Sequence, residues 1–567
     1  TCTAYNSPGG KITANFGQKP FKFPPPAGFQ PLNNANVRPE TVITRPDQYV
    51  GVVTYTGSAP TAQQITGLNF GTNPDFVWIK NYSDSTGYHH ALFDTVRGAN
   101  KVLSSSSTSA EGTTTQQLMS FDDNGFTVGT NSDSQNYVNL SADGYVAWTW
   151  KAGGNKNTFN VDDVGYANAS DVGMSVGSIR SAATNSAQTW SNNITTTGNS
   201  GNWWPTYPAT HIFDADTSNY GHANGNGGAC VVTLSFSPAI TCNASVTFIG
   251  GLTSSGAGTI SINGGTPVDL TTGSSSTTET VVPFSGSISS IVVTKTSTST
   301  QGLLVYGFKI DGTRLTDNTA FDVPNVPSVA ATGASVGTKQ GFSIIGYDGT
   351  QANMTISHGL EQAPELLIVK NRDSAFTEDW RTYHVGLTAA NRYLQLSKNA
   401  AEQVGATTWN STAPTDSVFS IGSGLTVNKS GDKYISYLWH SVPGLQKFGS
   451  YIGNQNADGV FVELGFRPAI VWLKCIGNYD PPYDWVIYDN LRQTINPNDK
   501  FLCPNSNNEE NKGSGGVDNT RYVDFLSNGF KIRNNSISIN LNLTPHIYCA
   551  WAEAPTVNLF GASSNAR

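Results

Sequence analysis

Charge is scarce in this sequence. Only 13% of the 567 residues are charged, and 32 Lys and Arg against 40 Asp and Glu leave a net charge of −8. A protein that binds nucleic-acid phosphates needs a clustered basic face, and no such cluster occurs along the chain. Long apolar runs are missing as well, since no stretch reaches the roughly 18 residues that a membrane-spanning helix requires. We therefore expect neither nucleic-acid binding nor membrane insertion.

Cysteine is equally sparse. The six cysteines are spread along the chain and never form a Cys-x-x-Cys pair, which argues against a disulfide scaffold or a zinc site. Cys230 and Cys242 could pair within one small domain, but two reduced, half-buried thiols are the favoured interpretation. Such thiols are typical of a protein assembled in a cytoplasm and released later. The chain opens at Thr1-Cys2 in what reads as the last strands of a domain, so a longer polypeptide upstream is expected.

The residues that are abundant favour β-structure. Lys and Glu, which favour exposed helices, are few, and β-branched and aromatic residues, which suit strands, supply most of the 37% apolar content. The 58 glycines, with many Ser, Thr and Asn, supply turns. A chain of this length holds about three to five domains. We predict an all-β protein built from tandem β-sandwich domains.

One pattern of about 100 residues occurs three times. Each copy opens with an apolar run that ends in a Tyr. A Pro follows 19, 17 and 17 residues later, and a Lys follows each Pro after 6 residues. The markers are Tyr55, Pro74 and Lys80 in the first copy, Tyr347, Pro364 and Lys370 in the second, and Tyr451, Pro468 and Lys474 in the third. Agreement of this kind is improbable by chance, so the copies are predicted to share one fold.

Each copy also contains a hairpin signature and a closing strand. The hairpin signature is an Asn-Gly or Ser-Gly turn between strand-like runs. It occurs at FDDNGFTV (121–128), FSIGSGLTV (419–427) and FLSNGFKI (525–532). The closing strands end at Trp150, Trp439 and Trp551 and are expected to pair with the opening strands. The repeated Tyr and Trp are expected to anchor each core rather than to bind ligand. The repeated Lys is expected to reach water from a strand end, with a functional lysine as the alternative.

Copies one and two are separated by a distinct β-rich domain. Its opening NWWPTYPATHIFDADTSNY (202–220) and its closing VYGFKIDG (305–312) resemble galactose-binding-like jelly rolls of the discoidin type. The resemblance implies an Asp-rich turn that helps to order the domain. Asp214 and Asp216 would form it, either as a hydrogen-bonded turn without metal, which is favoured, or around a calcium ion. No other cofactor is expected. Sugar-binding loops cannot be assigned by motif, so lectin activity is not implied.

Two further resemblances concern the start of the chain and the repeat. NFGQ (15–18) and PPAGFQPLN (25–33) resemble the end of SPRY or concanavalin-like β-sandwiches of phage proteins. PDFVWIKN (74–81), YVAWTWKAG (145–153) and FNVDDVGYAN (159–168) are similar to a domain of unknown function in large virion proteins of marine bacteriophages, especially cyanophages. That second resemblance implies a tail-fibre or structural protein of the particle, and it implies no activity.

The sequence thus predicts seven segments. They are the C-terminal end of a SPRY/concanavalin-like domain (1–40), β-sandwich repeat 1 (48–153), a linker (154–201), the galactose-binding-like jelly roll (202–317), a second linker (318–340), and β-sandwich repeats 2 (341–445) and 3 (446–560).

No catalytic framework stands out. The adjacent acids at 122–123, 162–163 and 509–510 would point to opposite faces of a strand, so they cannot work together as acid and base. His89-His90 lies in a polar loop without an HExxH framework. No GxSxG motif or phosphate-binding loop appears in a βαβ context. We expect a protein that is not an enzyme.

Binding is the more plausible role, because equivalent loops of the three copies are long, polar and divergent. The loop NYDPPYDW (478–485) combines aromatic rings with carboxylates, as the faces and hydroxyls of sugars require. The candidate glycan-binding residues are Tyr479, Asp480, Tyr483, Asp484 and Trp485. Structural packing of Trp485 is the favoured alternative for that residue.

These observations converge on a fibre or spike protein at the surface of a virus particle, assembled in the host cytoplasm. It is expected to be a homotrimer, which would hide sheet edges between chains. Its partners would be other virion proteins and a host-surface glycan or protein. A purely structural capsid, neck or tail decoration protein is the alternative, and a polysaccharide depolymerase is the third choice.

Overall fold

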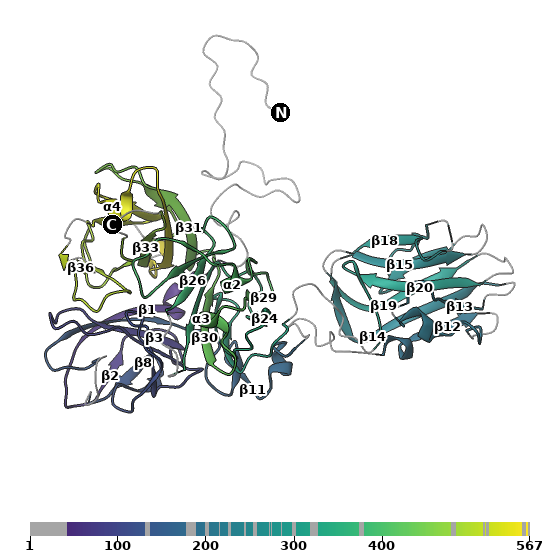
Figure 1. The fold of residues 1–567 in the computed structure, drawn as a ribbon, viewed down its shortest axis with the longest axis horizontal. Helices are drawn as coiled ribbons and strands as arrows, with labels where there is room; N and C mark the ends of the chain where they lie inside the picture. Colours follow the sequence, from purple (N-terminus) through teal and green to yellow (C-terminus); the bar gives the residue numbers. More distant parts are fainter. Residues whose placement is uncertain are drawn as a thin grey trace, which may run out of the picture.

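The protein is described by a computed structural model that is nearly all β, as the composition predicts (Figure 1). The segment 1–40, predicted to end a SPRY/concanavalin-like domain, lies outside the described residues. The structure describes residues 42–130, 137–176, 189–198, 203–317 with short gaps (215, 225–227, 243–244, 253–257, 272, 274, 285 and 297–301), 327–373, 379–477, 483–513, 516–517, 521–557 and 563–564. No helix within these ranges is long and apolar enough to cross a membrane.

The first repeat, unit 1, is a sandwich of two antiparallel sheets. One sheet has the order β1 (Val50–Thr56), β9 (Gly144–Trp150), β3 (Phe76–Asn81) and β4 (Ala91–Asp94). The other has the order β2 (Gln63–Thr66), β8 (Gly125–Val128) and β7 (Leu118–Asp122). The opening strand β1 pairs with the closing strand β9, with Tyr55 opposite Tyr145. The predicted closure of the unit on itself is confirmed.

Units 2 and 3 repeat this arrangement. Their opening and closing strands pair in the same way, with Tyr347 opposite Tyr434 and Tyr451 opposite His546. In unit 2 the larger sheet contains β23 (Phe342–Asp348), β30 (Lys433–Trp439), β25 (Leu366–Asn371), β26 (Arg381–His384), β27 (Arg392–Gln395) and β28 (Gln403–Val404), and faces β24 (Met354–Ser357) and β29 (Val418–Ile421). In unit 3 it contains β31 (Gln446–Ile452), β40 (Pro545–Ala552), β33 (Pro468–Cys475), β34 (Val486–Asp489) and β35 (Phe501–Leu502), and faces β32 (Phe461–Glu463), β39 (Gly529–Ile532) and β38 (Val523–Leu526).

The hairpin prediction holds in two units and is wrong in the third. β7 and β8 form a hairpin in unit 1, and β38 and β39 form one in unit 3. In unit 2 the strand β29 is followed by the short helix α3 (Leu425–Asn428). Gly424 has a φ of −65°, so the Ser-Gly pair there does not supply the left-handed conformation that such a hairpin turn needs.

The segments expected to be linkers contribute strands instead. β10 (Phe159–Val161) and β11 (Val164–Tyr166) come from the first segment, and β22 (Gly333–Gly337) comes from the second. β10 lies parallel to β22, and β22 pairs with β23 of unit 2, which gives a nine-stranded sheet. Phe159, Val161, Ala334 and Val336 are buried in the core of unit 2. The linker expectation failed because these few apolar residues are enough to add strands to an existing sheet edge.

The three units also share a central hydrophobic core. Besides the separate cores of the units, one cluster draws residues from all of them. The equivalent residues Trp150, Trp439 and Trp551 contact one another, with ring centroids 5.4 to 6.1 Å apart. The three repeats therefore form a single body, which we call the three-unit body (residues 42–176 and 327–557).

The domain between copies one and two, here called the insert (residues 189–317), is a separate β-sandwich with its own core. One sheet has the order β12 (Ile194–Gly198), β14 (Cys230–Cys242), β19 (Gly286–Lys295), β16 (Gly258–Ile262) and β17 (Val268–Asp269). The other has the order β13 (Gly221–Ala223), β20 (Leu303–Ile310), β15 (Ser245–Leu252) and β18 (Glu279–Pro283). Cys230 and Cys242 stand at opposite ends of β14, both buried and without a disulfide between them, so the prediction of two reduced thiols is confirmed.

The chain leaves and re-enters the three-unit body at one place, because the Ala331 amide donates to the Met174 carbonyl at 3.0 Å. Figure 1 shows the insert standing apart from the body. Deleting residues 177–326 and joining Val176 to Pro327 through a short Gly-Ser linker is therefore expected to leave the body folded. Calorimetry should show the body's unfolding transition within about 3 °C of its original midpoint. Loss of that transition would contradict the division into two independent parts.

Candidate functional site

The loop predicted to bind glycan is largely interior where the structure describes it. Trp485 is 1% exposed, and its indole Nε1 donates to the Gln395 carbonyl of unit 2. Asp484 is buried and accepts a hydrogen bond from the Asn505 amide. The favoured alternative, packing of Trp485, is therefore the state observed, and its ring offers no face to a ligand. Tyr483 lies beside these two, and Tyr479 and Asp480 lie outside the described residues.

Asp214 and Asp216 form a hydrogen-bonded turn. The Asp214 carboxylate accepts from the Asp216 amide at 3.0 Å and from the Asn219 side chain at 2.8 Å. The Asp216 carboxylate accepts from the amide and hydroxyl of Ser218, and these bonds lower the pKa of Asp216. Among the described residues no three His, Cys, Asp or Glu side chains gather as a metal site would require. A calcium ion in this turn stays a prediction.

The repeated lysines are buried rather than snorkelling, since Lys80, Lys370 and Lys474 are each at most 1% exposed. Each amine donates to a backbone carbonyl in the divergent loop of another unit. Lys80 of unit 1 bonds Asn507 in unit 3, Lys474 of unit 3 bonds Asn399 in unit 2, and Lys370 of unit 2 bonds Thr108 in unit 1. Desolvation lowers the pKa of Lys80 to about 7 and that of Lys474 to about 8. The same bond thus recurs in a closed cycle around the body.

A second cycle uses the residue that immediately precedes β4 in unit 1, β26 in unit 2 and β34 in unit 3. His90 of unit 1 contacts the Cys503 carbonyl of unit 3 at 3.0 Å. Trp485 of unit 3 bonds Gln395 of unit 2, and the Trp380 indole of unit 2 donates to the Ser104 carbonyl of unit 1. One histidine and two tryptophans therefore fill one position, and each contacts a neighbouring unit in the same direction as the lysine.

A third cycle is formed by Glu111, Glu402 and Glu510. Their backbone amides donate to the carbonyls of Arg372, Ile476 and Tyr82, at 3.1, 3.2 and 3.1 Å respectively. Each of these carbonyls belongs to a different unit from the glutamate that binds it. The interfaces between units are therefore built by backbone as well as by side chains, and the three of them are equivalent in plan.

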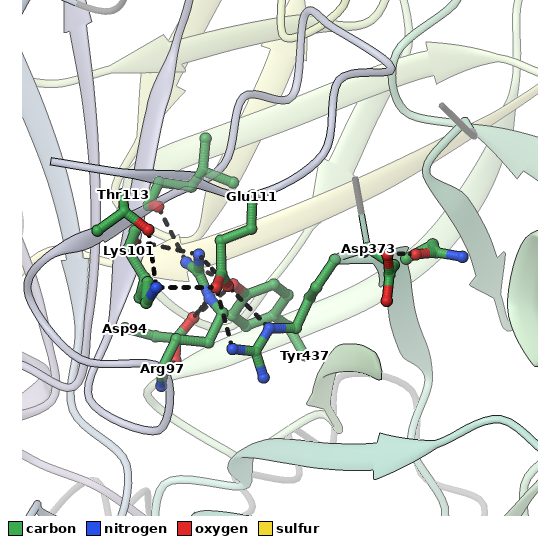
Figure 2. Close-up of polar contacts among 10 residues, drawn as sticks. Asp94, Arg97, Lys101, Glu111, Thr113, Asp373 and Tyr437 are labelled. Carbon is green, nitrogen blue, oxygen red and sulfur yellow. Dashed lines mark hydrogen bonds and ion pairs between the residues drawn. The ribbon is translucent and has the colours of Figure 1, made fainter. Parts of the chain in front are cut away.

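The interface between units 1 and 2 carries a buried charge cluster (Figure 2). Arg97 pairs with Asp94, and both side chains are fully buried. The Tyr437 hydroxyl of unit 2 donates to Asp94 at 2.7 Å. Glu111 accepts from both the Nε and an Nη of Arg372, at 2.8 and 3.1 Å. Burial raises the pKa of Tyr437 well above its usual value, so its hydroxyl stays protonated as a donor.

Unit 3 repeats this cluster against unit 1. Arg492 pairs with Asp489 and Glu510, and the Trp148 indole of unit 1 donates to Asp489 at 3.1 Å. Unit 2 departs from the pattern, because His384 stands in the place of the aspartate and contacts the Tyr548 carbonyl of unit 3 at 3.1 Å. The charged groups in both clusters are satisfied by one another, so they hold the units together rather than face a substrate.

A cleft of about 500 Å³ lies where the start of unit 1 meets unit 2. Its walls come from residues 42–49, 338–339, 361–362 and 440–443. Charges of both signs line it, and Arg45 is already paired with Asp47. An adjoining hollow of about 340 Å³ shares Tyr49 and Lys339 with it. The volume suits a small ligand, but the lining selects no particular chemistry.

The insert carries a feature that the sequence reading missed, a row of five neighbouring rings. This aromatic strip consists of Trp204, His222, Tyr207, Tyr220 and Tyr306. Successive ring centroids along it are 4.6 to 6.2 Å apart. The sequence held a signal, since WWPTY (203–207) and NYGH (219–222) are rich in rings, but only the pairing of β13 with β20 adds Tyr306.

Comparison with known proteins gives one family and one solved structure to report. The model of the family described as "Domain of unknown function (DUF7483)" matches residues 45–201 and 318–555. These segments contain the three-unit body, and the gap between them holds most of the insert. A solved structure, "Truncated AlyQ with CBM32 and alginate lyase domains", is 11% identical, with 59% of this chain and 91% of that chain covered. Its TM-score of 0.14 sets no constraint on fold or function. No curated protein matches the chain.

Proposed function

We propose, from the premise that the chain belongs to the DUF7483 family of domains of unknown function, that it is a non-enzymatic attachment protein at the surface of a bacteriophage particle. The three-unit body serves as a rigid scaffold, and the insert recognises the host surface. One observation carries this proposal: the insert leaves and rejoins the body at a single place, beside the Met174–Ala331 hydrogen bond. Such a geometry lets a recognition domain vary without disturbing its support.

The chemistry of the body supports a scaffold role. Its buried lysines and the backbone amides of three glutamates donate hydrogen bonds across unit interfaces. The aspartates of the two buried Asp–Arg pairs each accept a hydrogen bond from the neighbouring unit. Strongly shifted pKa values often mark active sites, but structural networks shift them too, and here each shifted lysine already has a carbonyl partner. The virion location is proposed on the resemblance of the repeat to phage virion proteins.

Labelled full-length chain is expected to bind the surface of some strains in a panel of marine bacteria, and the chain lacking 177–326 is expected to lose that binding. The physical reason is that recognition is assigned to the insert, whereas the body keeps its fold in the shortened chain. Flow cytometry measures both. Equal binding by the shortened chain would place recognition in the body. Binding to no strain would favour the purely structural virion component, and release of reducing sugar ends from surface polysaccharide would favour the depolymerase.

A further inference from the structure

The backbone around β13 fixes the aromatic strip in place. The Trp204 amide donates to the His222 carbonyl, and the His222 amide donates to the Tyr207 carbonyl, both at 3.0 Å. β13 pairs with β20 so that His222 lies opposite Leu304, which brings Tyr220 beside Tyr306. Main-chain hydrogen bonds therefore join β13 to the 204–207 segment on one side and to β20 on the other. They hold the five rings in place, as a preformed binding surface requires.

Trp204 is exposed although its indole packs on a second ring. Its indole stacks on His222, with centroids 5.0 Å apart and planes 8° apart, yet the residue is 43% exposed. Most tryptophan side chains of this protein are fully buried. Keeping a large apolar ring in water forgoes the stabilisation that burial gives. An exposed ring that is held by backbone bonds and backed by a second ring is suited to stack a ligand.

The rest of the strip supplies hydrogen-bonding groups of low charge. A hydrogen bond with Tyr207 raises the pKa of Tyr220 to about 12, so its hydroxyl stays protonated. Desolvation lowers the pKa of His222, which keeps the imidazole neutral. Arg314 bonds the Tyr306 carbonyl, and its Nε is buried. Tyrosine hydroxyls thus accompany the exposed Trp204 ring along the strip.

We propose that the aromatic strip is a polysaccharide-binding site, in which one sugar ring of a surface polysaccharide stacks on the exposed indole of Trp204. Neighbouring sugars of the same polysaccharide lie along the strip and bind the hydroxyls of Tyr207, Tyr220 and Tyr306. This assignment rests on the proposed attachment function and replaces the 478–485 loop as its site. A sugar presents apolar C–H faces together with many hydroxyls, which matches a ring flanked by neutral donors and acceptors.

Charge at the strip argues against nucleic acid as the occupant. A phosphate backbone needs several basic side chains, whereas Arg314 lies beside the exposed Asp214 and Asp216. Its cross-strand neighbour Lys309 is already paired with Glu279. The Arg314 guanidinium also reaches the Asp216 carbonyl at 3.4 Å. The balance of acidic and basic side chains near the strip therefore favours a ligand without dense negative charge.

The test measures affinity of the full-length chain for galactan, mannan, dextran and alginate by affinity electrophoresis. Trp204→Ala is expected to weaken the affinity for whichever polysaccharide the unchanged chain binds by about tenfold or more, because the variant loses one aromatic stacking contact. Tyr306→Phe removes only a hydroxyl and should weaken binding less. Val281→Ala changes another exposed apolar side chain of the insert and should leave binding unchanged. If Trp204→Ala lowers the melting temperature, Trp204→Phe keeps a ring and should retain part of the affinity.

The outcomes separate this site from the proposed function. Cell binding that survives Trp204→Ala, or polysaccharide binding that does so, overturns the strip while leaving attachment intact. Cell binding that is abolished by protease treatment of the cells, with no polysaccharide bound, overturns carbohydrate as the ligand class. Polysaccharide binding that depends on Trp204 supports the strip even where no tested strain is bound, and in that case the attachment proposal fails by itself.

Discussion

Replacing Arg97 by alanine is expected to lower the free energy of unfolding of the three-unit body by about 3–5 kcal/mol. Arg97 is fully buried and pairs with Asp94, which is also fully buried (Figure 2). Without the guanidinium, the buried Asp94 carboxylate keeps the hydrogen bonds from the Tyr437 hydroxyl and from the backbone amide of residue 97. Removing one member of a buried ion pair leaves an uncompensated charge, and this costs far more than the pair itself contributes.

Urea unfolding of Arg97→Ala against the unchanged chain measures this loss. The matched control is Arg533→Ala in unit 3, whose side chain is 43% exposed and pairs with Asp524. Exposed ion pairs contribute at most about 1 kcal/mol, so this variant should change stability little. Equal losses of stability for the two variants would show that the cluster between units 1 and 2 is solvated and does not hold the units together.

The sequence predicts the units well because their markers have local causes. Tyr and Trp recur where a strand must fill a core, so the pairing of opening with closing strands could be inferred from the repeat, and the structure adds the register, such as Tyr55 opposite Tyr145. Turn chemistry was equally local in two of the three hairpins. In unit 2 the Ser-Gly pair carries no such information, because a glycine also adopts ordinary backbone conformations.

What spacing cannot reveal is which surfaces meet between units. The recurrence of Lys80, Lys370 and Lys474 was visible, but a lysine at the end of an apolar run looks the same whether it reaches water or a neighbouring carbonyl. Its actual partner, such as Asn507 for Lys80, lies 427 positions away. The expectation for Trp485 was ambiguous for the same reason, since its partner Gln395 belongs to another unit.

The three-unit body also bears on the predicted homotrimer. That prediction relied on the need to cover sheet edges. Within one chain, the three copies already pack against one another, as the contacts of Trp380 and Trp485 across the unit interfaces show. The number of chains stays a separate prediction, which sedimentation can decide.

Lowering the pH from 7 to 4 is expected to destabilise the body by several kcal/mol, with His384 contributing about 3 kcal/mol. Burial lowers the pKa of His384 to about 4 and that of His546 to about 4. In the unfolded chain a histidine titrates near 6.5. Between these values the unfolded state binds more protons than the folded state, so stability is full above pH 6.5 and is lost as the pH falls toward 4.

The geometry of His384 explains why its neutral form is required. Its Nε2 stands 3.1 Å from the Tyr548 carbonyl of unit 3 and must donate, while its Nδ1 accepts from the Gly386 amide at 2.9 Å. A second proton on Nδ1 would face an N–H group and break that bond. His384→Asn keeps an acceptor for Gly386 but cannot be protonated, so its stability, measured by urea unfolding at pH 4 to 7, should fall less steeply than that of the unchanged chain. Parallel curves for the two proteins would exclude His384 as a source of the acid sensitivity. A flatter curve for His384→Asn would locate part of the acid sensitivity at the interface between units 2 and 3, where His384 stands in place of the aspartate that pairs with an arginine in units 1 and 3.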